Sequence, residues 1–268
     1  MPPFQPEHLT IDAAALHSEQ PGGRFVFLPG SPTRARAIAE HFEDRRGFPS
    51  PRGHEVFTGH LCRGDQRLEV ATVSTGMGCP SVDIIVSELL GLGARRLLRV
   101  GTAGSLQPAR VKAGDLVIAT GAVRDEGTSI HYAPLEFPAL AAWQLVQAAQ
   151  RAAATRSDLG SVHVGVVHTK DSLYARELGA GPRAEDHRRY RAQLSALGVL
   201  ASEMEAAHLF VLAQSHAGPQ GDEVWAGCIL GVVGDEVAFG DKTQRTRTEA
   251  AAIALGLETA WLAQSTSR

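Results

Sequence analysis

The chain has 268 residues, of which 44% are hydrophobic and 21% are charged, and 26 basic against 29 acidic residues give a formal net charge of −3. These values are typical of a globular protein and exclude a disordered, collagen-like or coiled-coil chain. Because the basic residues form no blocks, they also argue against a protein that binds nucleic acid through a charged face.

Short apolar runs that end at glycine alternate along the chain with alanine- and leucine-rich stretches. We expect strands at residues 24–28, 68–74, 97–100, 115–120, 163–169 and 224–233. We expect helices at residues 34–42, 81–92, 140–155, 205–215 and 248–264. Residues 194–200 carry the chain toward the last but one of these helices.

Strands that alternate with helices predict an α/β fold, with a mixed, mostly parallel twisted sheet that helices cover on both faces. The sequence contains no internal repeat, and we expect a single domain over residues 1–268. Residues 176–191 are dense in glycine, arginine and glutamate. At this length we expect them to form an active-site flap rather than a linker.

The three cysteines, Cys62, Cys79 and Cys228, lie far apart and form no cluster with histidine, which argues against a disulfide framework and a metal site. A reducing compartment fits this usage. The first ten residues lack the basic and apolar segments of a signal peptide. The longest apolar stretches, such as residues 226–233, are far shorter than the roughly 20 residues that cross a bilayer. We therefore expect a cytoplasmic protein with no membrane partner.

Glycine-rich turns follow three of the predicted strands, at residues 30–34, 74–78 and 99–105. Gly30 allows the backbone to approach an anion at a helix start, and Arg34 adds a permanently charged donor. Arg99 lies inside an apolar run, where a bound phosphate would compensate its charge. The alternatives are an ordinary turn with an exposed Arg34, and a buried structural ion pair at Arg99.

Other cofactor and nucleophile patterns are weak. The turn after the second predicted strand has serine at Ser81, where a dinucleotide fingerprint needs its third glycine, and Pro80 opens the following helix. No GxGxxG motif follows the first strand, and no GxSxG elbow or Ser/His/Asp order is present. These observations argue against a nicotinamide or flavin site and a serine hydrolase.

Acidic residues follow two later segments. In Glu203-Met204-Glu205, a carboxylate can bind two neighbouring sugar hydroxyls while the methionine packs on the ring, although acids are also common in a first helical turn. Asp235 ends the last apolar strand and could donate a proton if burial raised its pKa; the alternative is a turn carboxylate.

Histidine is plentiful, at eleven residues. We expect His8 and His131 at the site, and most of the others, such as His187, His208 and His216, at the surface.

With these motifs in hand, the chain resembles the nucleoside phosphorylases of the uridine phosphorylase and hexameric purine phosphorylase type. The likeness covers nearly the whole length and is carried by five ordered motifs, at residues 28–34, 74–78, 98–104, 123–138 and 202–206. The fourth is most similar to uridine phosphorylase. The resemblance implies a phosphorylase/hydrolase-like fold and a reversible phosphorolysis, in which a nucleoside and phosphate give a free base and a pentose 1-phosphate.

The resemblance also implies roles for individual residues. Phosphate would be held by Gly30, Arg34, Arg99 and Thr102, together with Arg52 from a neighbouring subunit. Ribose would contact Thr102, Glu203, Met204 and Glu205, and His8 would reach its 5′-hydroxyl across the same interface. Arg99, Glu205 and Asp235 are the expected catalytic residues.

The expected base site comprises Gly104, Leu173, Arg176, Glu177 and Asp235. Uridine phosphorylases recognise uracil with a glutamine and an arginine. Here either Glu177 replaces the glutamine or the glutamine position is displaced, and Arg176 or Arg183 could replace the missing arginine. Asp235 resembles the aspartate that protonates N7 in purine phosphorylases. We rank uridine first and keep a 6-oxopurine nucleoside as a rival.

The resemblance further implies a homo-oligomer, with a dimer as the minimal active unit and a hexamer as the full assembly. Phosphate would be a cosubstrate and no organic cofactor would be needed, although a monovalent cation could bind at the interface near Glu55 and Ser74. A nucleosidase on the same fold is disfavoured by the phosphate-type arginines. A non-catalytic nucleotide sensor is the third alternative.

Overall fold

The chain forms one mixed sheet of ten strands, six of which are the strands that the sequence predicts. The structure, a computed structural model, describes residues 4–216, 223–235 and 241–266. The strands are β1 (Phe25–Leu28), β2 (Glu43–Phe48), β3 (Val56–Arg63), β4 (Gln66–Val73), β5 (Arg96–Ser105), β6 (Leu116–Asp125), β7 (Ala139–Leu140), β8 (Val162–Lys170), β9 (Ala201–Glu203) and β10 (Trp225–Gly234). The helices are α1 (Ala13–Leu16), α2 (Pro32–Ala39), α3 (Cys79–Gly91), α4 (Trp143–Ala154), α5 (Ala184–Ala196), α6 (Ala206–His216) and α7 (Lys242–Thr266), with short helical turns η1 (Ser129–His131) and η2 (Leu173–Glu177).

Five of the strands close into a ring. β5 pairs in parallel with β10, β10 pairs antiparallel with β6, β6 and β8 are parallel, and β9 joins β8 back to β5. The strands β1, β4, β3 and β2 extend from β5 as an open sheet. The mixed α/β fold expected from the sequence is confirmed, and the closure of the ring is an addition that local patterns did not predict.

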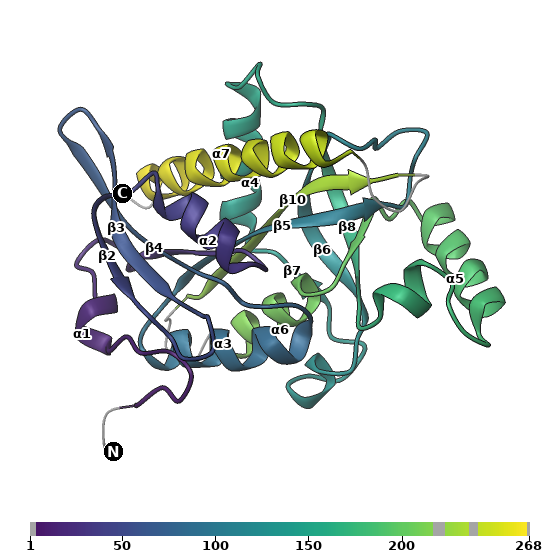
Figure 1. Ribbon diagram of the computed structural model, residues 1–268, viewed down its shortest axis with the longest axis horizontal. Helices are drawn as coiled ribbons and strands as arrows, with labels where there is room; N and C mark the ends of the chain where they lie inside the picture. The colour runs from purple at the N-terminus through teal and green to yellow at the C-terminus, as the bar shows by residue number, and fades with distance from the viewer. Residues whose placement is uncertain (1–3, 217–222, 236–240, 267–268) are drawn as a thin grey trace.

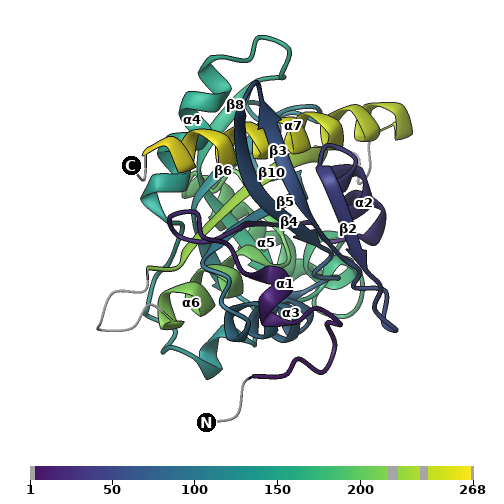
Figure 2. The same cartoon turned by 90° about the vertical axis from the view of Figure 1, so that its left-hand side faces the viewer.

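Helices cover both faces of the sheet (Figure 1). On one face, α3 and α6 pack together over an apolar layer that includes Leu89 and Phe210. On the other face, α2, α4 and α7 cover a second layer that includes Ile38 and Leu255. Figure 2 shows the same two helical layers from the side. The strands between them are buried on both faces, which explains their continuous apolar runs.

Three segments differ from the expectation. The β2–β3 hairpin was not predicted, because β2 reads Glu-Asp-Arg-Arg-Gly-Phe and is almost wholly exposed, so it carries no apolar alternation. The expected flap at residues 176–191 forms the end of η2 and most of α5. Residues 194–200 contain the end of α5 and the turn that leads into β9.

The N-terminal segment is fastened to α3 by one buried carboxylate. Glu88 accepts hydrogen bonds from the backbone N–H groups of Glu7, His8 and Leu9, at 2.8–3.1 Å, and contacts His8 Nδ1 at 2.7 Å. Burial acts to raise the pKa of Glu88, but the bonds from His8 and the backbone outweigh it, and the pKa lies below the ordinary value. The carboxylate therefore fixes both the segment and the His8 ring.

Glu88→Gln should lower the free energy of unfolding at neutral pH by roughly 1–3 kcal/mol, because a buried acceptor is replaced by an amide that faces donors. Since the native pKa is lowered, this contribution is present above the ordinary glutamate pKa of about 4.3 and is lost as the pH falls through the native value. Denaturant titrations at several pH values measure the difference. Exposed Glu40, changed to Gln, is the control. A deficit that stays constant down to low pH would contradict the role of the charge.

Candidate active site

The site forms where the neighbours of β5 change. One edge of β5 pairs with β1 as far as Arg99 and with β9 from Gly104 onward, so the two neighbouring strands diverge beside the residues between them. Ligands in α/β sheets bind at such switch points, outside the carboxyl ends of the strands. A pocket of about 270 Å³ lies here. Its lining includes Gly30, Arg34, Arg99, Thr102, Gly104, Leu173, Glu177, Glu203, Met204 and Glu205.

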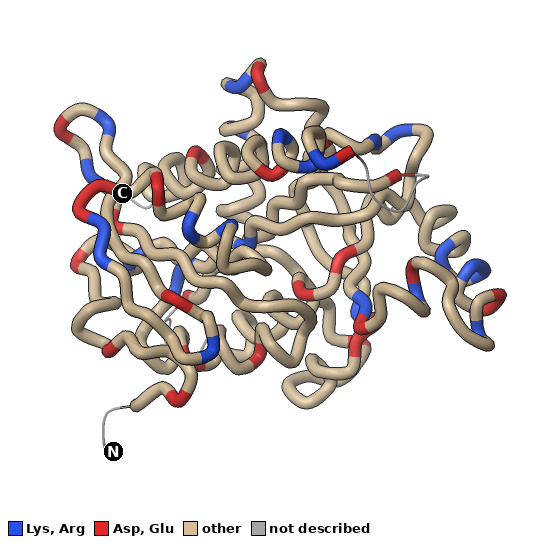
Figure 3. Tube along the Cα trace, viewed as in Figure 1, with Lys and Arg blue, Asp and Glu red and all other residues tan. Residues whose placement is uncertain are grey.

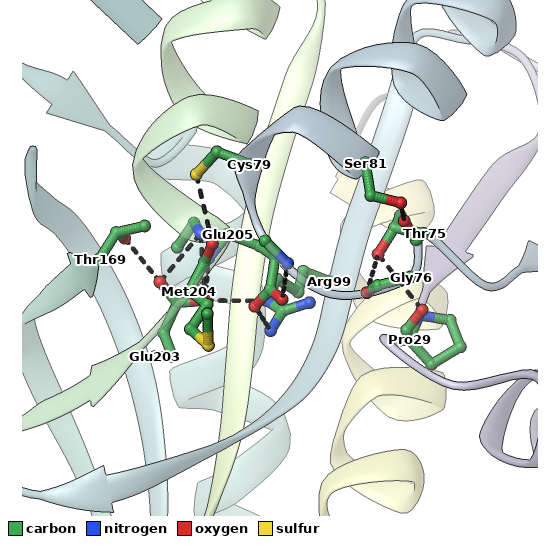
Figure 4. A network of polar contacts seen from close by, with 12 residues as sticks. Pro29, Thr75, Gly76, Cys79, Ser81, Arg99, Thr169, Glu203, Met204 and Glu205 are labelled. Carbon is green, nitrogen blue, oxygen red and sulfur yellow. Dashed lines mark hydrogen bonds and ion pairs between the residues drawn. The ribbon is translucent and has the colours of Figure 1, made fainter. Parts of the chain in front are cut away.

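Arg99 lines this pocket and lies between two buried carboxylates (Figure 4). Its Nε donates to Glu203 Oε2 at 3.1 Å, and its Nη2 donates to Glu205 Oε2. The three side chains are at most 6% exposed. The structural ion pair that the sequence left open is therefore present, and Arg99 Nη1 is buried with no hydrogen-bond partner among the described residues.

The two carboxylates have different environments. Glu203 also accepts from Thr169 Oγ1 and from the backbone N–H groups of Glu205 and Ala206 at the start of α6. Although burial acts to raise its pKa, Arg99 and these donors hold the pKa of Glu203 below the usual value. Burial and the charge of Glu203 instead raise the pKa of Glu205, against the effect of Arg99. Glu205 is the group that takes up a proton first.

A second arginine approaches the pocket from α2. Arg34 Nη2 donates to Glu249 Oε1 on α7 at 2.8 Å, while Arg34 Nε is buried without a partner in the described chain. Ser31 caps the helix by accepting from the Arg34 N–H at 3.2 Å. Two arginines with unpaired buried N–H groups and an adjacent helix start can receive an anion.

Lys170, which the sequence did not indicate as a site residue, lines the same pocket and is 2% exposed. Its Nζ lies 2.5 Å from Glu177 Oε2 and 2.9 Å from Ser202 Oγ. A lysine at a strand end usually indicates a solvated position. Its place as the last residue of β8, at the sheet edge that carries the other motifs, is the signal that could have identified it.

Five expected site residues do not line this pocket: Arg176, Asp235, His8, Arg52 and His131. Arg176 pairs with Asp125 at 2.6 Å and stacks on Tyr190, so its charge anchors η2 instead of facing the pocket. Asp235 accepts from the Ala113 N–H at 3.2 Å and borders a different depression. His8 and Arg52 do not line the pocket.

The histidines also differ from the expectation in part. His131 is exposed and does not line the pocket, whereas His208, expected at the surface, is fully buried and contacts Asp83 at 3.1 Å. The reason is that α6 is packed within the apolar layer beside α3, so even its polar positions face protein. Burial lowers the pKa of His208 more strongly than the Asp83 carboxylate raises it.

No group of three or more His, Cys, Asp or Glu side chains in residues 4–216, 223–235 and 241–266 has a geometry that could hold a metal ion. Within the same ranges, no helix combines the length and apolar character that a membrane crossing requires.

The pocket thus combines three cationic and three anionic side chains: Arg34, Arg99, Lys170, Glu177, Glu203 and Glu205. Cationic groups with free donors can bind an oxyanion, while buried carboxylates can accept from hydroxyl and ring N–H groups. Met204, between the two glutamates, supplies an apolar surface. The arrangement suits a polar ligand that joins a sugar, a heterocycle and an anion.

Comparison with known proteins agrees with this geometry. The profile of the Phosphorylase superfamily matches residues 24–257. The uridine phosphorylase of Treponema pallidum (strain Nichols) is 41% identical over 217 residues, which are 80% of this chain and 78% of that protein. The uridine phosphorylase of Escherichia coli (strain K12) is 33% identical over 87% of this chain and 90% of its own length. A guanosine phosphorylase of Halorubrum lacusprofundi is 31% identical over 88% and 86%.

Replacing Arg99 tests how far the site depends on it. Arg99→Met should lower the free energy of unfolding by about 3–5 kcal/mol, because two buried carboxylates lose their counter-charge. Arg110→Met, in an exposed turn, is the control and should change it by less than about 0.5 kcal/mol. Denaturant unfolding followed by fluorescence measures both. A loss at Arg99 no larger than at Arg110 would show that the carboxylates are compensated without it.

Proposed function

Because this chain belongs to the phosphorylase superfamily, we propose that it is a nucleoside phosphorylase, a pentosyltransferase that cleaves uridine with phosphate into uracil and ribose 1-phosphate. The observation that carries the proposal is the pocket in which Arg99 stands between Glu203 and Glu205 beside Arg34. The names of the relatives support uridine as the substrate.

Phosphate would bind at Gly30, Arg34, Arg99 and Thr102. The support is chemical: Arg34 Nε and Arg99 Nη1 are buried donors without a partner in the described chain, and leaving such donors unpaired is costly. The start of α2 adds backbone N–H groups and the positive end of its dipole. A dianionic phosphate would satisfy both arginines at once.

Ribose would lie against Met204, with its 2′- and 3′-hydroxyls on Glu205. Glu205 Oε1 accepts from the Gly78 N–H at 2.7 Å and Oε2 accepts from Arg99, so the carboxylate is held in one orientation. Each oxygen has a second lone pair that can accept from a hydroxyl. Glu205, which would bind the sugar, and Arg99, which would bind the phosphate, are therefore directly hydrogen-bonded to each other.

In this mechanism, the C1′–N bond stretches first and leaves an oxocarbenium-like sugar between two anions. An oxygen of the hydrogen phosphate dianion then forms the new bond to C1′, while the base departs with the bonding electron pair. The phosphate gives up its proton, and the departing base takes up one in exchange, so that free base and pentose 1-phosphate result. Arg34 and Arg99 would position the phosphate and stabilise its charge, which supplies most of the rate. The anionic Glu205 would also favour the positive sugar.

We also propose that the active unit is at least a dimer, and that the assembly is a hexamer. His8 and Arg52 do not line the pocket of their own chain, and both are accessible to a second copy. Glu88 holds His8 Nδ1, so the ring is oriented with Nε2 outward from this bond. Ile84, Ile130 and Leu135 are 42%, 52% and 59% exposed, and such apolar surface is typical of an interface.

The 6-oxopurine alternative has two supports. One relative is a guanosine phosphorylase, and Asp235 directly follows Gly234, which lines the pocket. If the Asp235 side chain turned toward a bound ligand, it could protonate a purine N7. Residues 236–240 lie outside the described part of the chain.

Further parts of the proposal concern cofactor and location. Phosphate is a cosubstrate and no organic cofactor takes part; a monovalent cation near Glu55 and Ser74 stays a prediction. A cytoplasmic location fits the three cysteines, which are free, with Cys79 and Cys228 buried. Burial raises the pKa of both thiols, which keeps them protonated.

A panel of uridine, thymidine, inosine, guanosine and adenosine, each with and without phosphate, tests the function. We expect release of free base only with phosphate, and fastest from uridine. Chromatography of base and sugar phosphate provides the measurement. Faster turnover of inosine or guanosine would favour the purine alternative, and base release without phosphate would identify a nucleosidase. Absence of turnover on all five would refute the proposal.

Arg34→Met should raise KM for phosphate by roughly tenfold to a hundredfold, because a charge-assisted contact is worth about 1.5–3 kcal/mol. The matched control is Arg36→Met on the same helix, since Arg36 is 62% exposed and pairs with Glu55 outside the pocket. Steady-state kinetics at varied phosphate give both values. An equal, small change in the two variants would remove Arg34 from the phosphate site.

A further inference from the structure

A buried ion pair stands in the part of the pocket where the base would bind. Lys170 Nζ and Glu177 Oε2 are 2.5 Å apart, and their side chains are 2% and 13% exposed. Burying two charges is expensive unless the geometry is fixed and the remaining donors are satisfied. Lys170 meets this condition, because its ammonium also donates to Ser202 Oγ at 2.9 Å and reaches the Glu203 carbonyl at 3.4 Å. All three of its N–H groups are thus directed at protein.

Behind Lys170, a chain of hydrogen bonds leads to Asp125. An ammonium can only donate, so Ser202 Oγ accepts from Lys170, and it also contacts His168 Nδ1 at 3.0 Å. The other ring nitrogen, His168 Nε2, contacts Asp125 Oδ2 at 2.9 Å. Asp125 Oδ1 accepts from Arg176. The Lys170 ammonium is therefore fixed from behind by a satisfied network.

Glu177 is fixed from its own side. Arg191 donates to its backbone carbonyl, and Arg176, the residue before it, is tied to Asp125. Its Oε1 lies over Gly104, so closely that a Cβ at that position would be 2.2 Å away. Glu177 Oε2 is engaged by Lys170, whereas Oε1 has no hydrogen-bond partner in the described chain. One carboxylate oxygen therefore remains available beside the pocket lining.

From this geometry we infer that Lys170 is a positioning residue that holds Glu177 as an acceptor-only group, and that Glu177 Oε1 selects nucleosides whose base presents a lactam edge, a ring N–H beside a carbonyl. The inference rests on the proposed function and deepens it. Uracil and the 6-oxopurines have this edge. Cytosine and adenine have an unprotonated ring nitrogen at the equivalent position.

The physical basis is the fixed hydrogen-bonding sense of a carboxylate. Glu177 Oε1 accepts from the N–H of a lactam, but it faces the lone pair of the ring nitrogen in cytosine or adenine, and a buried acceptor against an acceptor is unsatisfied and repelled. A glutamine would discriminate less, because its amide can turn and donate instead. Pairing with Lys170 holds the Glu177 carboxylate in one orientation. A site of this kind rejects a mismatched analogue much more strongly than an apolar pocket does.

The test uses selectivity ratios, kcat/KM for uridine over cytidine and for inosine over adenosine, because a ratio measured on one preparation is independent of how much of it is folded. The wild-type chain should favour the lactam member of its preferred pair by at least about a hundredfold. Glu177→Gln should reduce that ratio by about tenfold or more, while KM for phosphate stays unchanged. Glu185→Gln, an exposed change on α5, is the matched control and should leave the ratio as it is.

Two further variants separate selectivity from stability. Gly104→Ala should displace Oε1 without changing any charge, at little cost to the fold because the end of a flexible side chain can move, and should lower the ratio as Glu177→Gln does. Lys170→Met should also lower it, and combining Lys170→Met with Glu177→Gln should add little, because Lys170 acts through Glu177. Additive effects of the two substitutions would overturn the role of Lys170.

The outcomes distinguish this inference from the proposed function. Turnover of nucleosides with no preference for lactam bases, or a ratio unmoved by Glu177→Gln and Gly104→Ala, overturns the inference and leaves the function intact. If no nucleoside turns over, the function fails, and calorimetric binding of uracil against cytosine and of hypoxanthine against adenine decides the inference by the same ratios. Binding of none of the four bases then overturns both.

Discussion

The site depends on a single buried charge cluster, in which Arg99 is paired with both Glu203 and Glu205. None of the three could be buried alone, because an unpaired charge at such depth costs several kcal/mol. Together they connect β5, the start of α6 and the turn before α3 in one arrangement. The same contacts that stabilise this part of the fold also orient the groups that would meet phosphate and sugar.

The strand topology explains how distant residues reach this cluster. In the ring, β5 lies between β9 and β10. On the β9 side, β5 pairs with β1 as far as Arg99 and with β9 from Gly104 onward. Residues from all four quarters of the chain therefore meet at one edge of the sheet. Acidic and basic residues elsewhere are interspersed along the outer elements (Figure 3), so the charges of the pocket form a cluster distinct from that mixed surface.

The sequence predicts the elements that are buried on both faces and the turns that follow them, since apolar runs and glycines are local signals. It also indicates Arg99, because a charge inside such a run requires a partner. It does not predict β2, whose polar residues show no alternation, or the burial of His208 and Lys170, which depends on what packs against them. Arg176 illustrates the same limit: its neighbour Glu177 lines the pocket, but its own partner, Asp125, lies 51 positions away in the chain.

The closed ring of strands has a consequence for the order in which the protein can be made. Trp225 of β10 pairs with Arg96 of β5, and β10 also supplies the strand between β5 and β6, so the ring stays open until the last part of the chain is available. Contacts this far apart form late and slowly. On the ribosome, the strands that precede β10 would have an unfilled position in the ring and exposed apolar surface until β10 is synthesised, which makes the nascent chain a natural client for chaperones.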